Sequence, residues 1–459
     1  MHSFPGTIQS HKFKRWVKIF QGSSIRSRLA RGVTWSTAGS VVAQGSSLLT
    51  AMVVAQRVGI AAFGGFVLVQ STALMLQSVG SLGLGLATTR QVARLRTQDP
   101  RRTGRIIGFA LLFTVLAGIL LAGLAFTVPS AMIQSLLRTD HLDTMMRWVG
   151  LIACSFMISR IQADILVGLE AFRVMAAVHV VRGITTLLLT SLGAYGFGLT
   201  GAIIAFVGAG LITCIISQVM ITQACRSCGI ALTWRNVHTE IHLLGTSLFV
   251  TASSLTLALV TWILSVLLVR QEQGLAELAL FNAADRWRTA ILFLPSMLAQ
   301  VSLPLLAHTY TQERRSHYRR LLWESSGVGL LITAIPAITI ILLAPLVMSG
   351  YGAAFAPGKP VLMLLAVTCL PMSLCMIGAY GLWAAGKMAT MLSIDIMRGA
   401  IALSYCLLKS HFTAYDVAMG TLLSYLATTP LIALALIRLL ASHKDEACLT
   451  VGSTGVEPL

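Results

Sequence analysis

Eight ionisable residues stand inside apolar stretches of this sequence, and their side chains are the ones best suited to do chemistry. They are Arg160, Asp164, Arg182, Asp285, Arg286, Arg288, Asp395 and Arg398. A charge at membrane depth is costly unless it is paired or faces water, so each is a candidate functional residue. The forked N–H groups of arginine suit a phosphate or diphosphate. Five arginines against three aspartates favour an anionic substrate.

Spacing sorts six of these residues into pairs that can meet on one helical face, three or four positions apart. The pairs are Arg160 with Asp164, Asp285 with Arg288, and Asp395 with Arg398. A pair of this kind either makes burial tolerable or lines a transport pathway, and the sequence leaves both interpretations open. We therefore predict that Arg160, Asp164, Asp285 and Asp395 are ion-pair residues in the first case and ion-coupling residues in the second.

Two arginines have no acidic residue at such spacing. Arg182 stands beside His179, and Arg286 points away from its sequence neighbour Asp285. Arg182 and Arg398 also occupy similar places in two halves of the chain, early in the fifth apolar segment of each. We therefore predict that the substrate-binding residues are Arg182, Arg286, Arg288 and Arg398.

The elements that must position these residues are transmembrane helices. Of 459 residues, 56% are hydrophobic and 11% charged, and the mean hydropathy is +0.81. Apolar runs of about 20 residues, enough to cross a bilayer as a helix, recur along the chain. The expected fold is an all-α polytopic membrane protein of about 12 helices. Their predicted spans are 33–56, 62–86, 106–128, 149–167, 174–197, 200–222, 243–269, 278–301, 321–347, 360–385, 388–408 and 415–440.

A weak internal repeat divides the spans into two sets of six. "GIAAFGGF" follows the first span and "GLAELALF" the seventh, each with a phenylalanine seven residues after its first glycine. Two six-helix units of equal orientation would be related by an axis along the membrane normal, which predicts two pseudo-symmetric lobes around a central cavity. The predicted parts are a basic arm (1–32), an N-terminal lobe (33–222), a linker (223–242), a C-terminal lobe (243–440) and a tail (441–459) expected to be disordered.

The distribution of cations predicts the orientation in the membrane. The arm before the first span is basic, and the loops around 90–105 and 314–320 are also rich in arginine. By the positive-inside rule these segments lie in the cytoplasm, which places both termini there. The rule, with attraction to anionic headgroups, also accounts for the net charge of +18 without nucleic-acid binding.

Motifs for enzymatic or cofactor chemistry are missing from the sequence. Cys225 and Cys228 form a lone CxxC without two further ligands at suitable spacing, so no metal site is expected. Gly352 to Lys359 resembles a P-loop but has one residue too many and lacks the following Ser or Thr. With no loop long enough to fold alone, we predict a protein that is not an enzyme and needs no cofactor.

Four segments make the chain resemble the polysaccharide transporters, including O-antigen flippases, of the multidrug/oligosaccharidyl-lipid/polysaccharide exporter (MOP) superfamily. They are "RGVTWSTAGSVVAQ" from Arg31, "VGIAAFGGFVLVQS" from Val58, "GLEAFRVMAAVHVVRG" from Gly168 and "YTQERRSHYRRLL" from Tyr310. The resemblance implies two lobes that alternate between inward- and outward-open states in the bacterial inner membrane. It also implies a cationic cavity that carries an undecaprenyl-diphosphate-linked oligosaccharide to the periplasmic leaflet.

Other functions remain open from the sequence. A multidrug or cation exporter of the same superfamily would need an acidic or apolar cavity, against the cationic excess here. A membrane enzyme of polysaccharide assembly would be expected to carry a large periplasmic loop, and the outward loops are short. The expected partners are the lipid-linked glycan, membrane lipids and, as an interpretation left open, other polysaccharide-assembly proteins.

Overall fold

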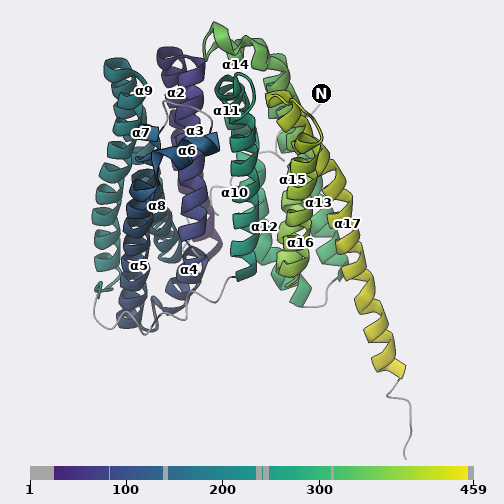
Figure 1. Ribbon diagram of the computed structural model, residues 1–459. Coiled ribbons are helices and arrows are strands. Elements are labelled where there is room, and N and C mark those ends of the chain that lie inside the picture. Colours follow the sequence, from purple (N-terminus) through teal and green to yellow (C-terminus); the bar gives the residue numbers. More distant parts are fainter. Residues whose placement is uncertain are drawn as a thin grey trace, which may run out of the picture. The chain divides into compact units, whose positions relative to one another are not determined.

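A computed structural model describes residues 25–81, 83–137, 143–233, 240, 248–311 and 315–452. This part of the chain is helical, as expected, and ten of its helices are long and apolar enough to cross a membrane (Figure 1). The protein is therefore an all-helical, multi-pass membrane protein. By contacts, the chain divides into two compact units that are not the two halves of the sequence. The predicted lobe boundaries and the shared cavity stay predictions.

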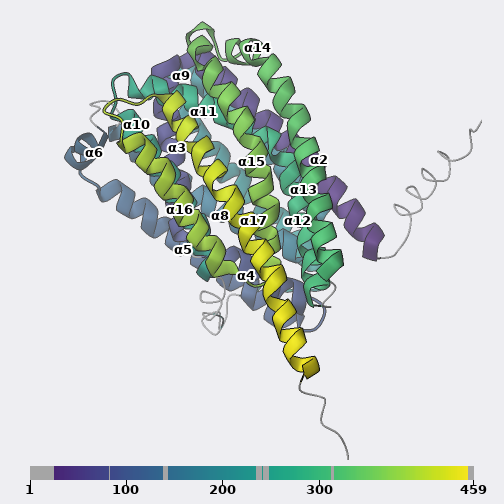
Figure 2. The ribbon, with the colours of Figure 1, turned by 90° about the vertical axis from the view of Figure 1, so that its right-hand side faces the viewer.

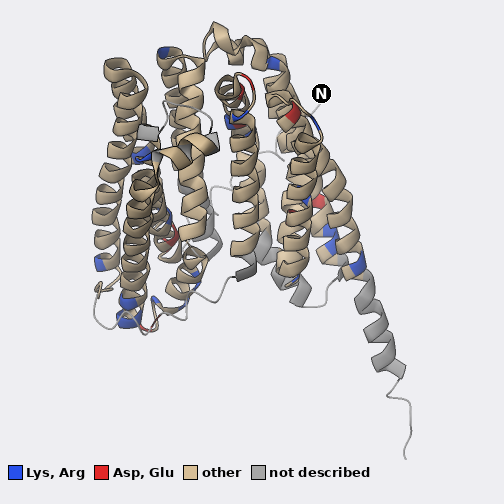
Figure 3. Ribbon diagram, viewed as in Figure 1, with Lys and Arg blue, Asp and Glu red and all other residues tan. Residues whose placement is uncertain are grey.

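Unit 1 comprises Met1–Thr50, Gly80–Thr127 and Trp148–Ser247. It contains the first part of α2 (Ile25–Val58) and all of α4 (Leu84–Leu95), α5 (Pro100–Thr127), α8 (Val149–Gly168) and α9 (Phe172–Ser227). A core cluster of this unit joins side chains of α4, α5, α8 and both ends of α9, with Ile106, Ile107 and Ile165 fully buried. Figure 3 shows basic residues gathered at one end of α5, and the rest of that helix carries no charged residue.

Helix α9 is a hairpin of two helices rather than one rod. Phe197 and Gly198 have non-helical backbone angles, and the φ of +60° at Gly198 lies in the left-handed region that favours glycine. Beyond this turn the two arms meet closely: a Cβ on Gly193 would lie 2.3 Å from the carbonyl oxygen of Gly201. The predicted spans 174–197 and 200–222 are thus confirmed as the two arms.

Unit 2 comprises Ala51–Val79, Val128–Arg147 and Leu248–Leu459. Figures 1 and 2 both show α15 and α17 side by side, and α16 also packs along α17. Aromatic rings of α3 and the 3-10 helix η2 meet in this unit, where the centroids of Phe63 and Phe355 are 5.9 Å apart. Its helices are α3 (Ile60–Gly80), α6 (Ser130–Leu137), α7 (Asp143–Met146), α10 (Leu248–Val269), α11 (Gly274–Ile291), α12 (Phe293–Thr311), α13 (Arg315–Leu342), α14 (Ala344–Ser349), η2 (Ala353–Gly358), α15 (Lys359–Ala384), α16 (Met388–Leu407) and α17 (Ala414–Gly452).

Several predicted boundaries were wrong, including the ninth span 321–347, which is interrupted at Leu343 between α13 and α14. The second span ends at Gly80, and the residues after it form the separate amphipathic helix α4, because Gly83 adopts a left-handed conformation. The eighth span is interrupted at Leu292, between α11 and α12. The tail predicted to be disordered from 441 continues α17 as far as Gly452. The basic arm lies outside the described residues up to 24, and 25–32 are helical.

Candidate substrate-binding arginines

The three predicted ion pairs are all present, each on one turn of its own helix. In α8 the Nε of Arg160 lies 3.2 Å from the Oδ2 of Asp164. The pair on α11 joins Arg288 and Asp285 at 2.6 Å, and the pair on α16 joins Arg398 and Asp395 at 2.7 Å. These spacings place both side chains on the same face of a helix, which is why the sequence sufficed to predict them.

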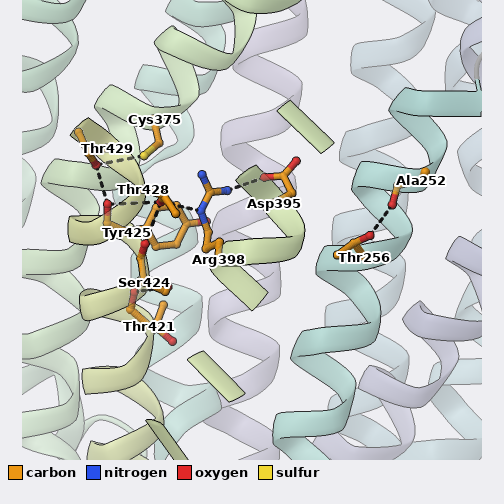
Figure 4. A network of polar contacts seen from close by, with 10 residues as sticks. All are labelled: Ala252, Thr256, Cys375, Asp395, Arg398, Thr421, Ser424, Tyr425, Thr428 and Thr429. Carbon is orange, nitrogen blue, oxygen red and sulfur yellow. Dashed lines mark hydrogen bonds and ion pairs between the residues drawn. The ribbon is translucent and has the colours of Figure 1, made fainter. Parts of the chain in front are cut away.

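The Asp395–Arg398 pair is the most deeply buried of the three. The side chain of Arg398 is 6% exposed and that of Asp395 is 3% exposed. The Nε of Arg398 donates to the hydroxyl of Thr428 at 3.2 Å, and its guanidinium stacks over the Tyr425 ring at 4.5 Å (Figure 4). An aspartate, a hydroxyl and a ring therefore hold this guanidinium inside unit 2.

Arg288 is held in a similar way at the edge of the same region. Besides its pair with Asp285, it donates from Nη1 to the sulfur of Met372 at 3.4 Å. Its side chain is partly buried, and it lines a cavity together with Arg398. The charge of each arginine is thus neutralised by an aspartate of its own helix.

Arg286 contacts a residue that the sequence did not single out. Its Nη2 donates to the Oε1 of Gln70 at 2.9 Å. Gln70 belongs to α3, the second predicted span, which carries no charge, whereas α11 belongs to the repeat-equivalent eighth span with three. An amide oxygen of another helix is therefore one partner of Arg286, and its orientation relative to Asp285 stays a prediction. The only sequence signal was a glutamine within an apolar segment.

Arg182 differs from the other three arginines. It lies on the first arm of α9 and is exposed. Within the described part of the chain it forms no ion pair. It lines a small pocket of unit 1 with His179, Ser159 of α8, and Thr213 and Ser217 of the second α9 arm. A guanidinium beside three hydroxyl groups is suited to hold a phosphate oxygen, because all these groups can donate hydrogen bonds.

The pocket beside Arg182 is narrow. Its volume of about 10 Å³ is close to what one water molecule needs. The pocket is therefore too small to hold a phosphate group. The hydroxyl groups behind it were not foreseen, because Ser159 and Ser217 lie on segments far apart in the sequence.

Comparison with known proteins identifies the family to which this chain belongs. A family model described as a polysaccharide biosynthesis protein matches residues 29–310, more than half of the chain. The chain belongs to this polysaccharide biosynthesis family. The family resemblance predicted from the sequence is thus confirmed. No curated protein matches the chain in sequence.

Solved structures with the same fold include transporters described as members of the MOP superfamily. An inward-facing multidrug resistance MATE family transporter has a TM-score of 0.70 at 15% identity, with 87% of this chain and 95% of that chain covered. Its outward-facing counterpart has a TM-score of 0.68 at 16% identity, covering 94% and 98%. A MOP superfamily transporter from Pyrococcus furiosus, described by the reverse polarity of its binding pocket, has a TM-score of 0.67 at 16% identity, covering 93% and 98%. At these identities the likeness shows the fold alone.

For this member of the polysaccharide biosynthesis family, the geometry orders the predicted site residues. Arg398 and Arg288 are committed to carboxylates, and Arg286 contacts an amide oxygen. Arg160 is exposed yet paired with Asp164. Among these predicted site residues, Arg182 is the exposed arginine that has no carboxylate partner in the described chain. Its guanidinium therefore keeps the most unused N–H donors.

Proposed function

We propose that this transporter moves an undecaprenyl-diphosphate-linked oligosaccharide from the cytoplasmic to the periplasmic leaflet of a bacterial inner membrane. The observation that carries the proposal is Arg182: an exposed guanidinium, without a carboxylate partner in the described chain, on a membrane-spanning helix of a polysaccharide-family transporter. The diphosphate is the part of such a substrate that needs a cation. The oligosaccharide and the isoprenoid need none.

The cost of placing Arg182 at this position supports a role in binding an anion. Insertion scales assign about 2.5 to 3.5 kcal/mol to an arginine at the centre of a membrane helix. Arg398 offsets this cost with Asp395, whereas Arg182 has no such compensation within the described residues. A diphosphate oxygen would supply the missing negative charge, and hydroxyl groups such as that of Ser159 lie on the adjacent helix.

A membrane potential would favour outward movement of this head group. If it carries about two negative charges, an interior-negative potential of 100 mV contributes roughly 4 to 5 kcal/mol to the crossing. Part of this gain is lost if Arg182 moves through the same field with the substrate. The aspartates Asp164, Asp285 and Asp395 remain candidates for ion coupling, although each is now held by an arginine of its own helix.

Orientation in the membrane follows from the charged ends of unit 1. Exposed arginines of α4, the start of α5 and the end of α9 include Arg90, Arg94, Arg101 and Arg226. We assign this end of unit 1 to the cytoplasm by the positive-inside rule. The assignment agrees with a substrate that is loaded from the cytoplasmic leaflet.

The substrate class can be tested with purified full-length protein in vesicles. A fluorescent undecaprenyl-diphosphate oligosaccharide is placed in one leaflet, and its arrival in the other is followed by quenching with an impermeant reagent. We expect protein-dependent translocation of the diphosphate lipid, competition by unlabelled diphosphate lipid, and no transport of cationic dyes. Transport of the dyes without any translocation of the lipid-linked glycan would overturn the proposal in favour of a multidrug exporter.

A further inference from the structure

Unit 2 contains a cavity that the proposed transport role does not use. It lies between α10, α11, α16 and α17, and residues of these four helices form its wall. Its volume of about 80 Å³ is several times the roughly 10 to 15 Å³ that one water molecule requires. The cavity therefore has room for a few waters or a small solute, but not for an oligosaccharide.

Guanidinium groups, but no carboxylates, line this cavity. Arg288 and Arg398 both line it, and no aspartate or glutamate is among the lining residues. The partner carboxylates, Asp285 and Asp395, bind the two guanidinium groups without themselves reaching the cavity. Both ion pairs therefore turn their positive ends toward the cavity, which favours a small anion there over a cation.

Each of the two arginines also has a nitrogen that donates no hydrogen bond in the described part of the chain. The Nη2 of Arg398 and the Nε of Arg288 are buried and have no acceptor in the described part of the chain. In Figure 4 the contacts of Arg398 run to Asp395 and Thr428 and leave its third nitrogen without a partner. Buried N–H groups are normally paired, so the site lacks an acceptor.

Hydroxyl groups complete the lining. Thr261, Ser265, Thr421 and Ser424 face the cavity, and each hydroxyl donates to a carbonyl oxygen of its own helix. These O–H groups rotate freely enough to donate to a ligand instead. The rest of the wall is largely apolar, including Leu264 and Phe281. An apolar wall favours a weakly hydrated monovalent anion over a multiply charged one, because dehydration costs less for the smaller charge.

We propose that this cavity binds a small monovalent inorganic anion of the class of chloride, held against Arg288 and Arg398. The bound ion adds a negative charge to a wall of two cations and stabilises the folded state of unit 2. The site does not rest on the proposed transport role, since it concerns a space too small for a lipid-linked glycan. It is measured by binding and stability, so its test is independent of any transport assay.

The test uses purified full-length protein in detergent, with thermal unfolding followed in sodium chloride, sodium bromide or sodium gluconate at equal ionic strength. We expect the halides to raise the Tm of the wild type by about 1 to 3 °C relative to gluconate. The charge-neutral double variant Asp395→Asn/Arg398→Gln should lose this difference. The matched control Arg160→Gln/Asp164→Asn removes an ion pair from unit 1 and should keep it.

Two results would overturn the proposal. One is a wild type with the same Tm in halide and gluconate, which would mean that water alone fills the cavity. The other is a full halide effect in the Asp395→Asn/Arg398→Gln variant. If that variant does not fold, wild-type crystals soaked in bromide decide the question by anomalous scattering: a peak between Arg288 and Arg398 supports the site, and its absence at full resolution rejects it.

Discussion

Arg182 in unit 1 and Arg398 in unit 2 occupy equivalent places in the sequence repeat but opposite environments. Each lies early in the fifth span of its half, and each is followed by glycine. Arg182 is exposed and forms no ion pair within the described residues, whereas Arg398 is 6% exposed and bound by Asp395 and Thr428. The difference in ion pairing follows from the sequence: three residues before Arg398 stands Asp395, and three before Arg182 stands His179.

The glycine after each arginine has kept the same packing role in both units. A Cβ on Gly183 would lie 3.0 Å from the Cα of Ala43 in α2, and one on Gly399 would lie 2.5 Å from a methyl group of Val260 in α10. In each case the fifth span approaches the first span of its own half. The helix packing is thus the same in both halves of the repeat. The neighbouring arginine differs, because Arg398 is ion-paired in unit 2 and Arg182 has no carboxylate partner among the described residues of unit 1.

The largest expected effect on stability comes from breaking the buried pair. Asp395→Ala should lower the free energy of unfolding by about 3 to 5 kcal/mol, because it leaves the Arg398 guanidinium buried without its carboxylate. Asp164→Ala should cost only about 0 to 1 kcal/mol, because its partner Arg160 is 66% exposed. Unfolding titrations in mixed micelles measure both. Equal losses for the two variants would contradict the contrast between the units.

A smaller loss of stability, similar in the two units, is expected from substituting Gly183 and Gly399. Gly183→Leu and Gly399→Leu should each lower the free energy of unfolding by about 1 to 3 kcal/mol, because the new side chain overlaps the first span of the same half. Gly208→Leu is the matched control, since a Cβ there meets nothing within 4 Å. The same unfolding titrations apply. If the control loses as much as the other two, close packing is not the cause.

The smallest expected effect concerns the hydrogen bond between Gln70 and Arg286. Gln70→Leu should lower the free energy of unfolding by about 0.6 kcal/mol, the average value for a hydrogen bond between membrane helices. In an Arg286→Leu background the same substitution should change nothing further, which a double-mutant cycle measures. A coupling near zero would show that this contact does not contribute to unit 2.

The sequence predicted local features well and long-range contacts poorly. The three ion pairs depend only on helical spacing, so the pairing of Asp395 with Arg398 could be predicted from their positions in the chain. The contact of Arg286 with Gln70 spans 216 positions, and that of Arg398 with Thr428 spans 30. Contacts of this kind depend on which helices become neighbours, and hydropathy does not encode that.

Helix ends were predicted less well than helix existence. Hydropathy predicted one span over 278–301, but the helix is interrupted at Leu292, one turn after the ion pair of Asp285 and Arg288. It also separated the two arms of α9 correctly, because "GFGLTG" after Tyr195 interrupts the apolar run. The exposure of Arg182 could not be inferred, since it depends on how α8 and both arms of α9 pack around it.

The most direct test of the difference between the two arginines is the rate at which variants translocate the labelled undecaprenyl-diphosphate oligosaccharide in vesicles. Arg182→Gln should reduce the initial rate at least about tenfold, equivalent to roughly 1.4 kcal/mol, while Arg182→Lys restores part of it. Arg226→Gln, which changes an exposed arginine at the other end of α9, should leave the rate within about twofold of the wild type. A wild-type rate for a correctly folded Arg182→Gln protein would contradict the account.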